Sequence, residues 1–285
     1  MDDVTAFSSS LDGWDPPATV VDDPIDPAPL HALAAALDRD PPSGGVVPPL
    51  WHWVYFVRWD PTRDLGSDGH PLAGPLLPPV PERTRVFGGG RVEFSAQLRC
   101  SIPARLRTSV SRRHVKKGRT GTMLVVTERR QVEQAGAVVL VEERDLVYRS
   151  GGNPKRALAP VRPDAGVTSD APWQAPLRTD PVLLFRFSAL TGNSHRIHYD
   201  RSYATSVEGY PDLVVHGPLL ALAMADLAAD RVPDRRMAAI RFRLRQPAFA
   251  GEPVLVTGHP DHAFANLAIV GADSQARATA EVEFD

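Results

Sequence analysis

The sequence predicts an α+β fold built from two similar halves, each with an antiparallel sheet. Two observations predict this class. Short runs of alternating polar and apolar residues recur in both halves, and glycines such as Gly118, Gly121 and Gly136 separate them, which is typical of antiparallel strands. The three-to-four-residue apolar spacing of a helix is confined to short stretches. Because each half carries an apolar segment followed by strands, we interpret the chain as a degenerate internal duplication.

Composition limits the function classes before any motif is considered. The chain has 285 residues, of which 43% are hydrophobic and 23% charged, as in ordinary globular proteins. A net charge of −2 argues against a nucleic-acid partner, which needs a basic surface. Cys100 is the only cysteine, which excludes an intramolecular disulfide and a cysteine metal cluster and favours a cytoplasmic location. The acidic start and the lack of an apolar run of ~20 residues predict neither a secretory leader nor membrane contact.

In the first half we expect residues 1–25 to be irregular and exposed. Asp26 is a suitable N-cap and Pro27 fits the first turn of a short helix, which Pro41 and Pro42 end. An apolar, aromatic segment of ambiguous periodicity follows, and then a loop to about residue 82. Alternation predicts strands over 91–98, 105–114, 121–131 and 137–148.

Residues 151–180 are rich in proline, glycine and aspartate, and they predict a linker between an N-terminal domain, 26–150, and a C-terminal domain, 181–285. The run 182–187 is typical of a strand. The clearest helical pattern lies at 217–230, with a proline in its first turn. In the proposed duplication, Pro49-Leu50-Trp51 of the first half corresponds in position to Pro218-Leu219-Leu220 of the second half. Strands are predicted over 237–245, 252–259, 264–270 and 275–284.

The polar stretch after residue 190 and the start of the long helix carry the most informative motifs. They are Thr191-Gly192, Asn193-Ser194-His195-Arg196-Ile197-His198-Tyr199-Asp200, Ala204 and Val215-His216-Gly217. In identity, order and rough spacing this block resembles the MaoC-like dehydratases, the R-specific enoyl-thioester hydratase branch of the hot-dog superfamily. It is most similar to the mesaconyl-CoA or itaconyl-CoA hydratases and the mitochondrial-type 3-hydroxyacyl-thioester dehydratases. Trp51-His52-Trp53, Gly66-x-x-Gly69-His70-Pro71 and Gly90-Arg91 are similar to the first half of such double-hot-dog proteins.

The resemblance implies a double hot-dog fold, in which two antiparallel sheets each wrap around a central helix. It implies a hydratase/dehydratase that interconverts an enoyl-thioester and a 3-hydroxyacyl-thioester of a short or branched, dicarboxylic-type acyl-CoA, with no cofactor. The motif occurs once, so we expect one active site per chain, in the C-terminal domain, and a non-catalytic N-terminal domain. Trp51, Trp53 and Tyr55 are candidates for the wall of the acyl site.

One residue departs from the family pattern. The aspartate expected five residues before the histidine is Asn193, and the usual asparagine is His195. An amide cannot take a proton at neutral pH, so Asn193 is expected to hold the water or the acyl group. His198 is then the expected general base, since an imidazole with an ordinary pKa of ~6.5 can both take and return a proton.

Charge pushed onto the thioester oxygen needs a stabilising group. A helix N-terminus offers unpaired N–H groups, and because Pro218 has none, we expect the donor to be Gly217 or Leu219, with His195 and His216 as further substrate-binding candidates. The spacing His195-x-x-His198-x-Asp200 invites a metal, but zinc needs three protein ligands in suitable geometry and no further carboxylate or histidine is clearly recruited, so we expect no metal. Asp200 is a reserve candidate for orienting a histidine.

The expected partner is an acyl-CoA or an acyl-carrier thioester, both of which are anionic. Arg241, Arg243 and Arg245 alternate on one strand face and are candidates for the phosphates, as is the basic cluster 105–119; the alternative is a solvated sheet face. A homodimer is a further expected partner.

Two other functions remain open. A hot-dog thioesterase would need a carboxylate near the carbonyl, for which Asp200 or Glu208 are the local choices. A non-catalytic acyl-thioester-binding protein would explain the missing aspartate.

Overall fold

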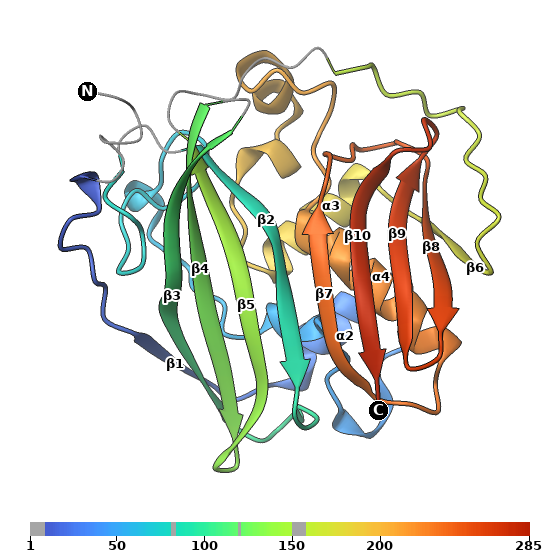
Figure 1. The fold of residues 1–285 in the computed structure, drawn as a ribbon, viewed down its shortest axis with the longest axis horizontal. Coiled ribbons are helices and arrows are strands. Elements are labelled where there is room, and N and C mark those ends of the chain that lie inside the picture. The colour runs from blue at the N-terminus through green and yellow to red at the C-terminus, as the bar shows by residue number, and fades with distance from the viewer. Residues whose placement is uncertain (1–8, 81–83, 119–120, 150–157) are drawn as a thin grey trace.

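The computed structural model describes residues 9–80, 84–118, 121–149 and 158–285. Their ten strands form one antiparallel sheet in the order β1-β3-β4-β5-β2-β7-β10-β9-β8-β6 (Figure 1). The first half contributes β1 (Thr19–Asp23), β2 (Thr84–Phe94), β3 (Ala104–Gly118), β4 (Gly121–Gln134) and β5 (Ala137–Arg149). The second half contributes β6 (Trp173–Leu177), β7 (Met237–Leu244), β8 (Val254–Asp261), β9 (Phe264–Gly271) and β10 (Ala276–Phe284).

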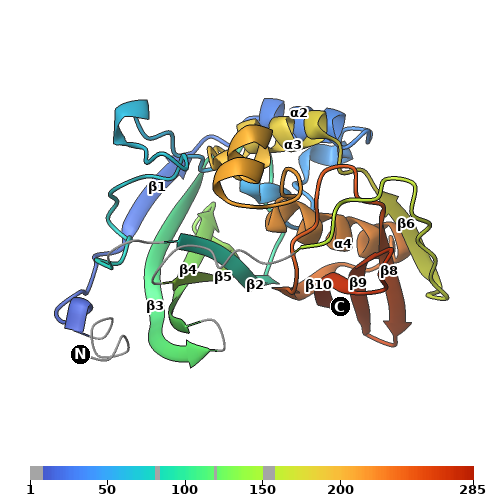
Figure 2. The same ribbon diagram turned by 90° about the horizontal axis from the view of Figure 1, so that it is seen from above.

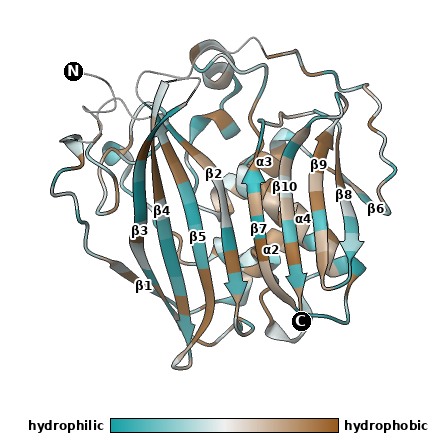
Figure 3. Cartoon of the chain, viewed as in Figure 1, coloured by the Kyte–Doolittle hydropathy of each residue, from teal (hydrophilic) through white to brown (hydrophobic). Residues whose placement is uncertain are grey.

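The two halves join where β2 pairs with β7, in a register that runs from Gly89 opposite Arg243 to Glu93 opposite Ala239. The two half-sheets are therefore continuous, and the strands of the second half curve around one helix (Figure 2). Hydrophilic and hydrophobic residues alternate along the strands (Figure 3), and β9 alternates between exposed and buried positions accordingly.

The hollow of the second half is filled by α4 (Gly217–Arg231), which contacts β6, β7, β8, β9 and β10. Its buried side chains include Leu219, Leu220, Leu222 and Met224, each at most 2% exposed. Full burial of such a side chain stabilises the fold by about 1.5–3 kcal/mol. The predicted helix at 217–230 and the strands around it are confirmed, as is the α+β hot-dog class.

The first half does not enclose a central helix within its described residues, so that part of the prediction is wrong. The segment expected to match the start of α4 forms a single 3-10 turn, Trp51–Val54, which follows Leu50 in a left-handed conformation (φ 68°). The predicted short helix is α2 (Pro27–Ala36), capped by the Asp26 carboxylate as expected. It packs against α3 (Pro181–Leu190) and the 3-10 turn, on the side of α4 away from the sheet (Figure 2).

The run 182–187 was expected to be a strand, but it lies inside α3. The Asp180 carboxylate accepts hydrogen bonds from the N–H groups of Val182 and Leu183, and Pro181 occupies the first turn, so a strong helix start overrides the apolar run. Two further strands were missed: β1 lies in the segment expected to be irregular, and β6 lies in the expected linker, where it pairs with β8. In the described residues no helix has the length and apolarity needed to span a bilayer.

A buried charged network ties β5 to the 3-10 turn. The Glu142 carboxylate is 1% exposed, and it accepts hydrogen bonds from Trp53 Nε1 at 2.8 Å and Arg144 Nε at 2.6 Å. Arg130 Nη1 lies 3.6 Å from its second oxygen, and His52 Nε2 lies 3.4 Å from the same oxygen. One carboxylate therefore compensates two largely buried guanidinium groups.

Replacing Glu142 with alanine is expected to lower the free energy of unfolding by about 3–5 kcal/mol, because both arginines lose their buried counter-charge. Urea denaturation followed by circular dichroism measures this. Glu143→Ala is the matched control, because Glu143 is next in sequence, partly exposed and paired only at 3.6 Å with Arg112 and Arg129; it should cost about 1 kcal/mol or less. Equal losses in the two variants would contradict the assignment.

Candidate active site

A cavity of about 1180 Å³ opens where the two halves of the chain meet. Its wall combines residues from 53–71 and from β2 and β5 of the first half with residues from within 191–199, 208–218 and 244–248 of the second half. Asn193, His195, His198 and Gly217 all line it. The structure thus brings together four of the residues that the motif predicted.

His198 lies at the end of a 3-10 turn, Arg196–His198, and it is 7% exposed and lines the cavity. Its Nδ1 lies 2.7 Å from the Val214 carbonyl oxygen. A carbonyl only accepts, so Nδ1 carries the hydrogen and donates it. In the neutral ring Nε2 is then unprotonated and free to act as a base. Burial lowers the pKa of His198 to about 4, which keeps the ring neutral at physiological pH.

His216 supports His198 from behind. The two rings stack with centroids 3.8 Å apart and planes 18° from parallel, and His216 Nε2 lies 2.8 Å from Ser188 Oγ. His216 has no solvent exposure and does not belong to the cavity wall. The structure thus places this substrate-binding candidate behind His198, with its ring packed against the His198 ring.

The side-chain NH₂ of Asn193 is the part of this residue that can bind a ligand in the cavity. Its Oδ1 accepts a hydrogen bond from the backbone N–H of His195 at 3.1 Å, and its own N–H donates to the Ser188 carbonyl at the end of α3. The NH₂ group is then left to donate to a ligand in the cavity. An amide takes no proton at neutral pH, so in this geometry Asn193 can offer a ligand only a hydrogen-bond donor.

The N-terminus of α4 lies at the cavity wall. His216 occupies the N-cap position, and no side chain caps this end of the helix. Gly217 belongs to the cavity wall, with no hydrogen-bond acceptor for its N–H among the described residues. Leu219 does not line the cavity and is fully buried, so of the two predicted donors Gly217 is the one that the cavity reaches.

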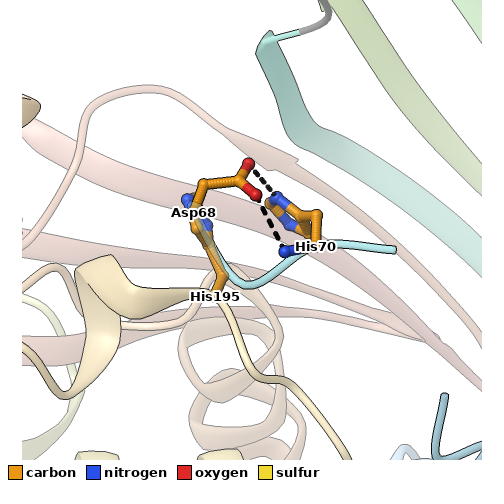
Figure 4. Close-up of side chains that lie close together, drawn as sticks. All are labelled: Asp68, His70 and His195. Carbon is orange, nitrogen blue, oxygen red and sulfur yellow. Dashed lines mark hydrogen bonds and ion pairs between the residues drawn. The ribbon is translucent and has the colours of Figure 1, made fainter. Parts of the chain in front are cut away.

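The first half contributes two residues that the sequence reasoning did not assign. Asp68 and His70 come from the loop before β2, and the His70 ring packs 4.1 Å from the ring of His195 (Figure 4). Asp68 Oδ2 lies 2.8 Å from His70 Nδ1, while Oδ1 accepts from the His70 N–H at 2.9 Å. The Gly66-x-x-Gly69-His70-Pro71 motif was the signal that contained them, but nothing in it gave a partner 125 residues away.

Backbone contacts dock this loop onto the histidine segment. The Arg196 N–H donates to the Asp68 carbonyl at 2.9 Å, and Ser194 Oγ donates to the Gly69 carbonyl at 2.7 Å. Gly69 has φ 88°, and a Cβ there would lie 1.9 Å from the Ser194 carbonyl oxygen. Only glycine permits so close an approach in that conformation.

Asp68, His70 and His195 could offer three ligand atoms to a metal, since these atoms lie within 4.8 Å of one another. The Asp68 carboxylate is already engaged by the His70 ring and N–H, however, and we assign no metal to the group. Asp200, the reserve candidate, does not face a histidine: its Oδ2 accepts from Arg196 at 2.7 Å.

The three arginines of the predicted carrier site do not lie together at the cavity. Arg241 pairs with Glu281 at 3.0 Å away from the cavity, and Arg243 is likewise exposed outside it, whereas Arg245 reaches the cavity wall. Trp53 and Tyr55 line the cavity as expected, but Trp51 does not, because its Nε1 donates to Asp226 of α4 inside the core.

The fold and the site together define a class of protein: hot-dog enzymes that add or remove water beside an acyl-thioester. Residues 50–250 match the family model described as hydroxyacyl-thioester dehydratase type 2. The chain is 41% identical over 258 residues to the mesaconyl-C(4)-CoA hydratase of Chloroflexus aurantiacus, with 89% of this chain and 91% of that protein covered. It is 24% identical over 270 residues to the mitochondrial hydroxyacyl-thioester dehydratase type 2 of Schizosaccharomyces pombe, with 83% and 88% covered.

A MaoC-like dehydratase from Phytophthora capsici shares the fold, with a TM-score of 0.65 at 16% identity over 95% of both chains. The chain therefore belongs to the hydroxyacyl-thioester dehydratase type 2 family. It is an enoyl-thioester hydratase/dehydratase of the MaoC-like hot-dog type, which confirms the activity predicted from the motif around His198.

Gly69→Ala should lower hydration turnover by about 10²-fold, because the added Cβ displaces the loop from the histidine segment by an ångström or more. Steady-state kinetics on crotonyl-CoA measures this. Gly136→Ala is the matched control: Gly136 also has a positive φ, 79°, but a Cβ there meets no atom within 4 Å. It should cost only about 1–2 kcal/mol of stability and leave turnover intact. Equal turnover in the two variants would show that the docking is dispensable.

Proposed function

We propose that the enzyme hydrates a short or branched enoyl-thioester that carries a second carboxylate, with His198 as general base. The observation that carries this role is the hydrogen bond from His198 Nδ1 to the Val214 carbonyl, which leaves Nε2 as a proton acceptor at the cavity wall. The dicarboxylic acyl group is supported by the printed activity of the C. aurantiacus relative, mesaconyl-C(4)-CoA hydratase. The proposed chemistry needs no cofactor.

In hydration, Nε2 of His198 accepts a proton from water as the water oxygen attacks the β-carbon. The electron pair of the double bond moves toward the α-carbon and the thioester oxygen. The Gly217 N–H at the positive end of α4 stabilises that oxygen, a contribution that can reach ~3 kcal/mol. The Asn193 amide donates a hydrogen bond that orients the water or the acyl group. Dehydration follows the same path in reverse.

We infer that the carrier phosphates bind where the cavity meets Arg85, Lys116 and Arg149, with Arg245 on the opposite half. Lys116, Met123 and Arg149 lie in one row across β3, β4 and β5. Arg85, Lys116 and Arg149 line the cavity without a carboxylate partner among the described residues, and Arg149 Nε is buried without an acceptor. Cations left unpaired at a cavity favour an anionic ligand. A cytoplasmic location and a homodimer stay predictions.

The activity is tested with purified protein and a panel of crotonyl-, mesaconyl- and itaconyl-CoA, together with the matching pantetheine thioesters. Loss of enoyl absorbance without release of free thiol supports hydration. A lower KM for the CoA thioesters than for the pantetheine thioesters supports the phosphate site. Thiol release would identify a thioesterase, and binding without either change would identify a binding protein.

His198→Ala should lower turnover on the preferred substrate by about 10²–10⁴-fold and leave the fold intact, because a positioned base contributes that much. His31→Ala is the matched control, since His31 is an exposed histidine on α2 that does not line the cavity. Near-normal turnover of the His198 variant would remove this residue from the mechanism.

The plot of kcat/KM against pH should begin to fall only at acidic pH, well below the ordinary pKa of histidine. Burial lowers the pKa of His198 to about 4, so kcat/KM should stay level from pH 8 to about 5 and fall tenfold per unit below about 4, as the base becomes protonated. The same shift bears on stability: the pKa in the folded state lies below the ordinary value of 6.5, so the stabilisation is present above pH 6.5 and is lost as pH falls toward 4. Circular dichroism at each pH separates the two effects. An acid limb near pH 6.5 in folded protein would contradict the assignment.

A further inference from the structure

We propose that Asp68 and His70 form a second acid–base pair of this active site, and that His70 moves the proton at the α-carbon. The inference rests on the proposed hydration and goes beyond it. Position 193 is an asparagine, whose amide cannot exchange a proton at neutral pH. The first half supplies a carboxylate from another direction, joined to an imidazole that lines the same cavity.

The geometry fixes the tautomer of His70 as it does that of His198. Asp68 Oδ2 lies 2.8 Å from His70 Nδ1, so Nδ1 donates and Nε2 is left to exchange a proton. Burial alone would raise the pKa of the Asp68 carboxyl, but the hydrogen bonds from His70 and the charges of His70 and His195 together lower it. The carboxylate is therefore ionised, and it stabilises a proton on His70. Figure 4 shows this pair beside His195.

His195 lies between the two bases. Its ring centroid is 4.1 Å from that of His70 and 5.5 Å from that of His198, in an edge-to-face arrangement with the latter. Three imidazoles thus line the same cavity. The Asp68 carboxylate lies within 4.8 Å of ring nitrogens of both His70 and His195, but it shares a hydrogen bond with the ring of His70 alone. Burial lowers the pKa of all three rings, but the hydrogen bond to Asp68 opposes this effect at His70, which is where we place the excess proton.

This pair completes the path of the proton from the attacking water to the α-carbon. His198 Nε2 takes a proton from water as the water oxygen forms the bond to the β-carbon, and the π electrons become the enolate pair. The proton passes by way of His195 and bound water to His70. His70 Nε2 delivers it to the α-carbon, where the enolate pair forms the new C–H bond. One water is added in total, and each side chain returns to its starting state.

A purely structural role would act through the docking of the loop, but the backbone already provides that docking. The Asp68 and Gly69 carbonyls accept from Arg196 N–H and Ser194 Oγ, and neither bond involves the Asp68 carboxylate or the His70 ring. Side-chain replacements at these two positions therefore leave the loop anchored. They separate a chemical role from a structural one.

The test measures kcat, KM and the kinetic isotope effect of an α-deuterated 3-hydroxyacyl-CoA in the dehydration direction. His70→Gln should lower kcat by about 10²–10³-fold with little change in KM, because a catalytic proton transfer is lost. Asp68→Asn should lower kcat by about tenfold or more, since the positioning carboxylate no longer stabilises the proton on His70, and Asp68→Glu should restore part of it. In both impaired variants the isotope effect should rise, because transfer at the α-carbon becomes slower than the other steps. His31→Gln should match the wild type.

Three results would overturn the pair. The first is a kcat of His70→Gln within threefold of the wild type. The second is a loss of kcat in folded Asp68→Asn with an unchanged isotope effect, which would indicate a structural role. The third is activity that EDTA abolishes and zinc restores, which would assign the three residues to a metal. The wild-type enzyme is assayed on the enoyl-CoA panel before any variant is made. If it turns over none of these substrates, the proposed function itself is rejected.

Discussion

The site depends on one hydrogen bond, from His198 Nδ1 to the carbonyl of Val214. That carbonyl cannot move, because the Val214 N–H donates to Ile197, the Val215 N–H donates to Ala248, and Val214 bridges to Phe249. The bond fixes the tautomer, aims Nε2 at the cavity and orients the ring that His216 stacks upon. A buried imidazole without it could present either nitrogen, and the base would no longer be defined.

The second constraint is the seam between the half-sheets, because the cavity takes its wall from both sides of it. The glycines of Gly88-Gly89-Gly90 in β2 allow its backbone to approach the backbones of β7 and β5 closely. Gly89 adopts φ 140°, and a Cβ there would lie 2.4 Å from the Phe242 carbonyl oxygen of β7. At Gly90 a Cβ would lie 2.5 Å from the Glu143 carbonyl oxygen of β5. The triple glycine thus lets β2 fit between its two neighbours, and through that pairing the first half reaches the histidines of the second.

Sequence reasoning predicted what is local. The strands around α4, the start of α4 and the roles open to Asn193 and His198 follow from short patterns whose chemistry lies within a few residues. It failed where distant groups decide. The apolar run 182–187 predicts a strand, but the Asp180 cap, which the sequence reasoning did not consider, makes it part of α3. The expected central helix of the first half is a 3-10 turn held by buried charges around Glu142. Asp68 and His70 were not assigned, because their importance comes only from a loop docked far along the chain.

A crystal structure of the enzyme with a bound 3-hydroxyacyl-CoA tests the central claim most directly. The account predicts that His198 Nε2 lies about 2.6–3.2 Å from the 3-hydroxyl oxygen while Nδ1 stays on the Val214 carbonyl. It also predicts the thioester oxygen against the Gly217 N–H. A ligand whose hydroxyl contacts another residue, or a His198 ring turned so that Nδ1 faces the ligand, would contradict it.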